Sequence, residues 1–195
     1  ASIQSSNRLT ELDFEMSLAA LSEGVLASDI GVVLLQMLPE DDPLRPYAAK
    51  LSHKSFDIPL AGLLNGSIDV VLRLGPVDAP SLFIADYKSN RLDTEGDVQV
   101  IDAYAPSRLV HAMEHHHYPL QALLYGTSIY RMLRWRAPHL DPDTTIGGVA
   151  YLFIRGMVGE KTPVDEAGNP YGVFTWRAPA GLWERLSDLF AGVRP

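Results

Sequence analysis

Two strand-like segments joined by a short turn constrain the fold of this chain more than any other feature of its sequence. Residues 56–75 and 81–89 are rich in apolar and β-branched side chains, and the Gly- and Pro-containing segment 75–80 lies between them. Because the connection is so short, we expect the two strands to form an antiparallel hairpin. Gly66, inside the first strand, predicts either a bulge or a close approach of another group to the backbone.

The remaining segments alternate between strand-like and helix-like patterns. Ser28 or Asp29 is expected to cap a short helix that runs to about Leu38. The segment 39–46 is rich in helix breakers and predicts a loop. The main helix is expected to begin at Pro119, because the first turn of a helix tolerates proline. Similar patterns predict strands over 12–18, 145–156 and 172–179, helical structure from 106 to 136, and a closing helix over 180–192.

Length and composition are those of a single globular domain. The 195 residues include 47% apolar and 21% charged side chains, enough for one sizeable hydrophobic core. Strands mixed with helices on a central sheet predict an α/β or α+β architecture. The large side chains of the predicted elements are expected to lie in the core: Phe14, Met16, Tyr151, Phe153 and Trp183.

Several classes of protein are disfavoured by the composition. No apolar stretch reaches the roughly 18 residues of a membrane-spanning helix, and the first residues lack the pattern of a secretion signal, so no membrane association is expected. The absence of cysteine excludes disulfides and thiolate metal sites, and it fits a reducing compartment, so we expect a cytoplasmic protein. The net charge of −8 disfavours a general nucleic-acid binder.

The end of the second hairpin strand carries the charged residues with the clearest chemical meaning. Asp86 and Lys88 are two residues apart, so they share one face of the strand, and Tyr87 lies on the other. Asp69, on the first strand, is expected to lie close to Asp86. Two converging carboxylates repel each other unless a cation lies between them, and oxygen ligands suit Mg²⁺, or Mn²⁺ in its place. An Asp-x-Lys triplet alone is common by chance, and a solvated ion pair is the alternative interpretation.

The hairpin and four further segments, in order along the chain, together resemble the nuclease domain of the RecB family, a branch of the PD-(D/E)xK nucleases. The segment GSIDVVLRL…LFIADYKSN resembles the family's G-x-I-D…DYKS core, and HHHYPLQALLYGTSIYRMLRWR resembles its Q-x-x-x-Y helix. The segments IGGVAYLFIRG, AGLWERLSDLFAG and ELDFEMSL resemble the family's later strand, its closing helix and its first strand. The resemblance therefore covers nearly the whole chain.

The resemblance implies a fold and an activity. The implied fold is α/β with a restriction-endonuclease-like core, in which helices flank a central mixed β-sheet. The implied activity is Mg²⁺-dependent DNA cleavage of the exodeoxyribonuclease V type, acting in double-strand-break repair and homologous recombination. The implied partners are single-stranded DNA ends produced by unwinding, together with RecC-like and RecD-like subunits.

The resemblance also implies roles for individual residues. Asp69, Asp86 and the main-chain carbonyl of Tyr87 would bind the metal, and Lys88 would be the catalytic lysine. Gln121 and Tyr125, one helical turn apart, would position DNA or the loop at the active site, although Tyr125 is equally compatible with core packing. Glu11 matches an accessory acidic position of the family.

One feature of the family is missing from the sequence. Its metal-binding histidine lies on a helix before the first strand, whereas this chain has no histidine before His53 and no phosphate-binding loop of a helicase motor. We therefore expect residues 1–195 to form a single nuclease domain, a C-terminal fragment of a longer helicase-nuclease that lacks its N-terminal helix. Two alternatives stay open: a catalytically incompetent module that docks DNA or subunits, and a hydrolase of another phosphate ester.

Two groups of basic residues allow both a structural and a functional interpretation. Three consecutive histidines, His115, His116 and His117, point in different directions on a helix, so a solvated helix start is favoured over a zinc site. Contact of His116 or His117 with a phosphate is a further alternative. Arg131 and Arg134, with Arg136 beyond them, predict either a solvated helix end or a DNA phosphate track.

Overall fold

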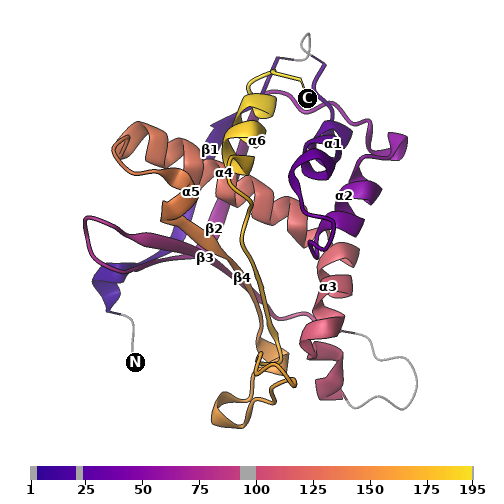
Figure 1. The fold of residues 1–195 in the computed structure, drawn as a ribbon, viewed down its shortest axis with the longest axis vertical. Helices are drawn as coiled ribbons and strands as arrows, with labels where there is room; N and C mark the ends of the chain where they lie inside the picture. The colour runs from indigo at the N-terminus through magenta and orange to yellow at the C-terminus, as the bar shows by residue number, and fades with distance from the viewer. Residues whose placement is uncertain (1–3, 21–23, 93–99, 195) are drawn as a thin grey trace.

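A five-stranded mixed sheet organises the computed structural model, which describes residues 4–20, 24–92 and 100–194 (Figure 1). The strands follow chain order across the sheet, and every neighbouring pair is antiparallel except β3 and β4, which are parallel. Parallel neighbours need a crossover connection, and the segment between β3 and β4 supplies it with helices. The strands are β1 (Arg8–Ser17), β2 (Leu63–Leu74), β3 (Ser81–Lys88), β4 (Ile146–Phe153) and β5 (Val173–Trp176).

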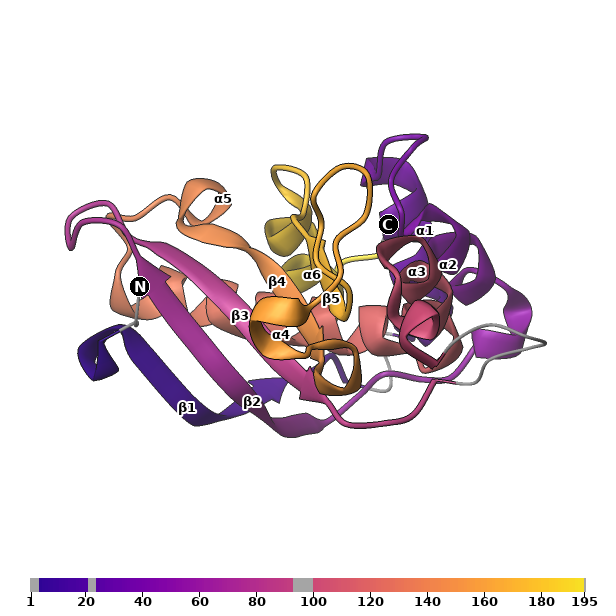
Figure 2. The same ribbon diagram turned by 90° about the horizontal axis from the view of Figure 1, so that it is seen from below.

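Six α-helices accompany the sheet in the described ranges. The longest, α4, contacts β1 and β4, and α6 packs against it. Figures 1 and 2 place α1, α2 and α3 together on one side of the molecule and the β2–β3 turn on the opposite side. The helices are α1 (Ala27–Met37), α2 (Arg45–Leu51), α3 (Pro106–His115), α4 (Tyr118–Arg136), α5 (Pro142–Thr145) and α6 (Leu182–Phe190). Short 3₁₀ helices are η1 (Ser5–Asn7), η3 (Lys54–Phe56), η4 (Val100–Tyr104), η5 (Ile154–Gly156) and η6 (Gly159–Lys161).

The predicted hairpin is confirmed, but its first strand is shorter than predicted. β2 and β3 pair in the antiparallel direction, yet β2 begins at Leu63, and Phe56, the predicted first strand residue, ends η3. Gly66 pairs in register with Phe14, so no bulge occurs there. A Cβ atom at position 66 would lie 2.8 Å from Phe14 Cζ, which confirms the alternative prediction of a close approach.

β1 confirms the predicted alternation of apolar and polar side chains, and the strand itself begins earlier than predicted, at Arg8. Phe14 packs against the core and Met16 is buried, whereas the intervening Glu15 is exposed. The backbone of Glu11 has a positive φ of 51°, a conformation that non-glycine residues seldom adopt. Its neighbours remain paired on both sides, so the irregularity is confined to one residue.

The helices differ from the predictions mainly at their ends. Neither Ser28 nor Asp29 is the N-cap of α1, because Leu26 occupies that position. Asp29 lies within the first turn, where its carboxylate accepts the backbone N–H of Leu26 at 2.8 Å. The predicted loop 39–46 runs into α2, a helix that the breaker-rich sequence did not indicate. α4 begins one residue before Pro119, close to the predicted start.

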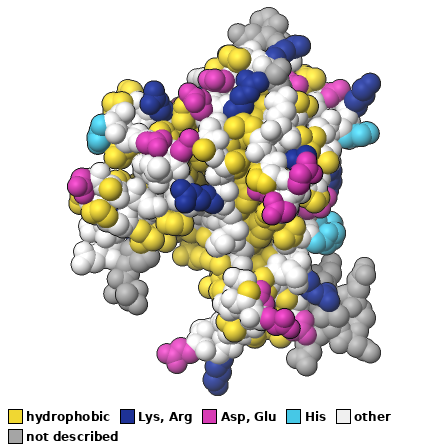
Figure 3. Space-filling view, viewed as in Figure 1, with side chains coloured by type: hydrophobic (Ala, Val, Ile, Leu, Met, Phe, Trp, Pro, Cys, Tyr) yellow, Lys and Arg dark blue, Asp and Glu magenta, His cyan; other side chains and the backbone are white. Residues whose placement is uncertain are grey.

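The large residues predicted to form the core lie there. Met16, Tyr151, Phe153 and Trp183 are buried, and Phe14 packs against them at the edge of the cluster. None of the helices in the described ranges is both long and apolar enough to cross a membrane. On the face shown in Figure 3, hydrophobic side chains gather in the middle, and acidic and basic side chains are interspersed among and around them.

Candidate active site

Two aspartates meet where β2 and β3 stop pairing. The paired register ends with Val70 opposite Ala85, so Asp69 and Asp86 are the next residues of the two strands. Asp69 Oδ2 accepts the backbone N–H of Tyr87 at 2.9 Å, which ties its carboxylate to the neighbouring strand. Asp86 is only 3% exposed, so its carboxylate is held inside the protein.

Lys88 lies on the same face as Asp86, as the two-residue spacing predicted. Its ammonium forms an ion pair with Asp86 Oδ2 and is 4.2 Å from the centroid of the Tyr118 ring. Tyr87, between the two, is 52% exposed on the opposite side of the strand. An ion pair with this little exposure retains a fixed geometry, because its groups have few alternative partners in water.

Helix α4 supplies the groups that orient the lysine. Gln121 Oε1 accepts hydrogen bonds from Lys88 Nζ at 2.9 Å and from the Tyr151 hydroxyl at 3.1 Å. Gln121 Nε2 donates to the Tyr125 hydroxyl at 2.8 Å, and Tyr125 in turn hydrogen-bonds to Asp86. The side chain of Gln121 therefore links the helix to both members of the ion pair.

Burial sets the protonation behaviour of this network. It raises the pKa of Asp86, and the hydrogen bond and charge of Lys88 oppose that rise. Burial, reinforced by the Asp86 charge, raises the pKa of Tyr125 to about 12. The same causes raise the pKa of Tyr151. Both phenols therefore keep their protons at neutral pH and remain hydrogen-bond donors.

The carboxylates offer a partial ligand set for a hard divalent cation. Asp86 Oδ2 is buried and contacts the Lys88 ammonium, yet it receives no hydrogen bond of ordinary geometry from the described residues. With Asp69 beside it and the Tyr87 carbonyl at the next position, the donors are all oxygens, which Mg²⁺ prefers. No group of three or more His, Asp or Glu side chains gathers anywhere in the described parts of the chain. The donor set therefore fits an ion that keeps several water ligands.

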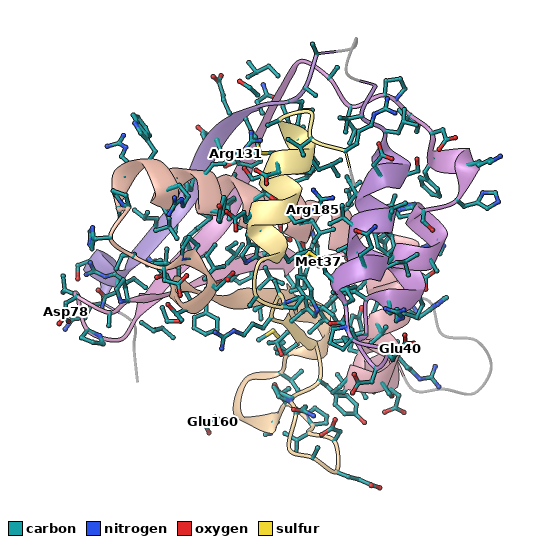
Figure 4. The ribbon with its side chains drawn as sticks, turned by 45° about the horizontal axis from the view of Figure 1, so that its top comes forward. Met37, Glu40, Asp78, Arg131, Glu160 and Arg185 are labelled. Atoms are coloured by element: carbon teal, nitrogen blue, oxygen red, sulfur yellow. The ribbon has the colours of Figure 1, made fainter. Side chains whose placement is uncertain are left out.

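The other predicted residues lie outside this network. By register Glu11 is opposite Asp69, but its side chain is exposed and makes no hydrogen bond or ion pair with the described residues. Arg131 lies ten residues beyond Gln121, about 15 Å along the helix. Its guanidinium donates to the Ser17 carbonyl and to the Ser187 side chain and carbonyl, beside α6 in Figure 4. Arg134 is exposed near the end of α4.

Two tyrosines of the network were not predicted as site residues. Tyr151 was assigned to the core, where it lies, but it also pairs with Asp86 across β3 and β4. Tyr118 lies three residues before Gln121, a spacing that places the two on one face of a helix. The pairing of Tyr151 with Asp86 could not be inferred from periodicity, because the partner strand of β4 is not known from the sequence. The spacing of Tyr118 and Gln121 was therefore the only signal in the sequence for either tyrosine.

The three consecutive histidines, predicted at a helix start, span the junction of two helices, with His117 at the N-cap of α4. His115 is the last residue of α3, and His117 adopts a left-handed conformation with φ 56° before α4 begins. His117 Nδ1 hydrogen-bonds with the Tyr47 hydroxyl at 3.0 Å. The His115 and His116 rings meet edge to face with 4.9 Å between their centroids, whereas His117 contacts Tyr47, and all three side chains are exposed. This is the arrangement expected of solvated histidines rather than of a zinc site.

The fold and the site define the class of this protein. Its mixed sheet, flanked by helices, with Asp69, Asp86 and Lys88 at adjoining strand ends, is a restriction-endonuclease-like core of the PD-(D/E)xK class.

Comparison with known proteins gives the family. The chain is 50% identical over 190 residues to the RecBCD enzyme subunit RecB of Mycobacterium tuberculosis, covering 94% of this chain and 16% of that protein. It is 46% identical over 194 residues to RecB of Mycolicibacterium smegmatis, covering 97% of this chain and 18% of that protein. The identity to RecB of Escherichia coli is 32% over 187 residues, covering 96% and 14%. No protein-family model matches the chain. Over the portion of RecB that it matches, the chain belongs to the RecB family.

Proposed function

We propose that this chain is the DNA-cleaving domain of a RecBCD-type helicase-nuclease and hydrolyses phosphodiester bonds with Mg²⁺, or with Mn²⁺ in its place. The observation that carries the proposal is the convergence of Asp69, Asp86 and Lys88 at the ends of adjoining strands. Homology to RecB, a subunit of the RecBCD enzyme, supports a nucleic acid as the substrate.

The roles of the residues follow from their contacts. Asp69, Asp86 and the Tyr87 carbonyl would hold the cation, which when bound lowers the pKa of a coordinated water and polarises a phosphoryl oxygen. Lys88 Nζ is fixed by Asp86 and Gln121, so it can offset negative charge on the non-bridging oxygens of the phosphate without moving. Tyr125 keeps its proton and holds the Asp86 carboxylate in place.

The wider setting of this activity extends beyond the chain. The chain spans about one-sixth of the length of the RecB proteins that it matches. In the proposal, the remainder of the full-length protein includes the unwinding motor, and RecC-like and RecD-like subunits complete the complex. The substrate is then a single-stranded end released by unwinding, and the process is double-strand-break repair and homologous recombination in the cytoplasm.

The test is cleavage of end-labelled single-stranded DNA by the full-length protein in its complex, with Mg²⁺ or Mn²⁺. Asp86→Ala is expected to lower the rate at least roughly 100-fold, because it removes a metal ligand and the partner of Lys88. Asp13→Ala is the matched control, since Asp13 is an exposed aspartate on β1. Cleavage by Asp86→Ala as fast as by the unaltered protein would refute the proposal.

A docking module without catalytic activity is the second candidate. It is favoured by the small number of charged ligands, because the described residues bring only two carboxylates together. Calorimetry with Mn²⁺ separates the two functions. A nuclease is expected to bind the ion in a manner that Asp69→Ala abolishes, whereas a docking module shows no binding that depends on Asp69.

A further inference from the structure

A cavity of about 540 Å³ lies between α3 and the segment that follows β3. It combines a buried apolar floor, which includes Leu92 and Ala112, with a rim of exposed basic side chains. No described side chain that lines it is acidic, although the net charge of the chain is −8. The basic residues of this cavity, called here the α3 pocket, are Arg91, Arg108, His111, His115 and His116.

Stacked rings connect the α3 pocket to the catalytic lysine. The Tyr118 ring, which lies under Lys88 Nζ, stacks on the His116 ring with 5.2 Å between their centroids. Asn90 joins the same two rings, since its amide donates to His116 Nε2 at 3.3 Å and its carbonyl accepts from the Tyr118 hydroxyl at 3.4 Å. The pocket therefore begins one side chain beyond the residue that contacts Lys88.

The chemistry of the rim suits a phosphate. Guanidinium groups pair with phosphate oxygens through two parallel hydrogen bonds, and Arg91 and Arg108 are both exposed. Glu114, which follows Met113 on α3 and precedes the lining residue His115, is paired with Lys50 at 3.5 Å and is not among the lining residues. An apolar floor below the rim lowers the local dielectric constant and strengthens such pairs.

We propose that the α3 pocket binds a backbone phosphate of the DNA strand, at a nucleotide that flanks the bond being cut. This role rests on the proposed nuclease activity. A strand held at the α3 pocket and at the metal site is fixed in register, so cleavage depends on one particular phosphate away from the scissile bond. Removing the charge of that phosphate and removing the arginines should then lower the rate of cleavage in the same way, because both changes abolish one interaction.

The test uses short single-stranded oligonucleotides, each carrying one neutral methylphosphonate at a different position, and the full-length protein in its complex with Mg²⁺. For the unaltered protein, we expect replacement at one flanking position to lower kcat/KM for cleavage roughly tenfold. The Arg91→Ala/Arg108→Ala variant is expected to cleave the unmodified strand roughly tenfold more slowly and to show no further loss at that position. Arg108→Lys alone retains the charge and should keep most of the response.

Arg8→Ala is the matched control, because Arg8 is an exposed arginine at the start of β1 and does not line the α3 pocket. It should respond to every methylphosphonate as the unaltered protein does, and thermal unfolding midpoints confirm that each variant is folded. A double arginine variant that keeps the full positional response overturns the proposal. If the double arginine variant keeps this response but no longer assembles with its partner subunits, the proposal is also overturned, because the pocket then binds protein instead of DNA. Failure of the unaltered protein to cut any strand refutes the nuclease function instead.

Discussion

Replacing Gln121 by leucine tests how Lys88, the proposed catalytic lysine, is positioned. Leucine has a similar volume, so the substitution removes polar contacts and leaves the packing of α4 nearly unchanged. It deletes the hydrogen bonds from Lys88 and Tyr151 to Gln121 Oε1 and the bond from Nε2 to Tyr125. Lys88 keeps its ion pair with Asp86 but loses the contact that sets its direction toward the substrate.

The magnitudes follow from these contacts. A hydrogen bond to a charged group contributes about 1.5–3 kcal/mol, so loss of the Lys88 contact is expected to lower kcat roughly 10- to 100-fold. The free energy of unfolding falls less, by about 1–2 kcal/mol, because Lys88 and Tyr151 each retain another partner. For a chain of this size that loss lowers the unfolding midpoint by about 3–6 °C.

The assay is steady-state cleavage of single-stranded DNA by the full-length protein, with kcat and KM determined separately. A positioning role predicts a lower kcat with KM nearly unchanged, which loss of stability alone does not produce below the unfolding temperature. Gln36→Leu is the matched control, since Gln36 is an exposed glutamine on α1. If Gln121→Leu cleaves DNA at the unaltered rate, the inferred role of the Gln121 network is wrong.

Three further predictions concern the metal, the packing and the pH dependence. Asp69→Asn keeps an oxygen that accepts a hydrogen bond but removes the charge, so Mn²⁺ affinity measured by calorimetry should fall at least about tenfold while the unfolding midpoint changes little. Gly126→Ala should lower the free energy of unfolding by about 1–3 kcal/mol, because the alanine Cβ would lie within 2.3 Å of the Trp183 ring. In a chain that also carries Trp183→Leu, the same substitution should lower the unfolding midpoint less. Burial raises the folded-state pKa of Tyr47 to about 12 from 10 in the unfolded chain. The contribution of the protonated phenol to the free energy of unfolding is therefore fully present below pH 10 and is lost as the pH rises from 10 to 12. Tyr47→Phe should therefore show a shallower fall in unfolding midpoint over that interval, and an identical fall would contradict the burial of this phenol.

The sequence allowed the placement of the charged site residues to be predicted better than their supporting contacts. The spacing of Asp86 and Lys88 placed them on one face, and the short connection of the hairpin brought Asp69 beside them, because both relationships are local. The position of Gln121 against Lys88 depends on how α4 crosses the sheet. That crossing is decided by side-chain packing between segments far apart in the chain, so the helical spacing alone left the role of Gln121 open.

Local and long-range interactions therefore determined different features of this protein. By itself the sequence determined the hairpin, the main helices and the charged strand end, since turn residues and hydrophobic periodicity act over a few residues. Only the tertiary structure decided that Tyr151 joins the Lys88 network, that Arg131 is bonded to β1 and α6, and that basic residues of α3 and the segment after β3 enclose one pocket. Each depends on parallel pairing or helix packing across long stretches of chain, where the burial of the whole core outweighs any local preference.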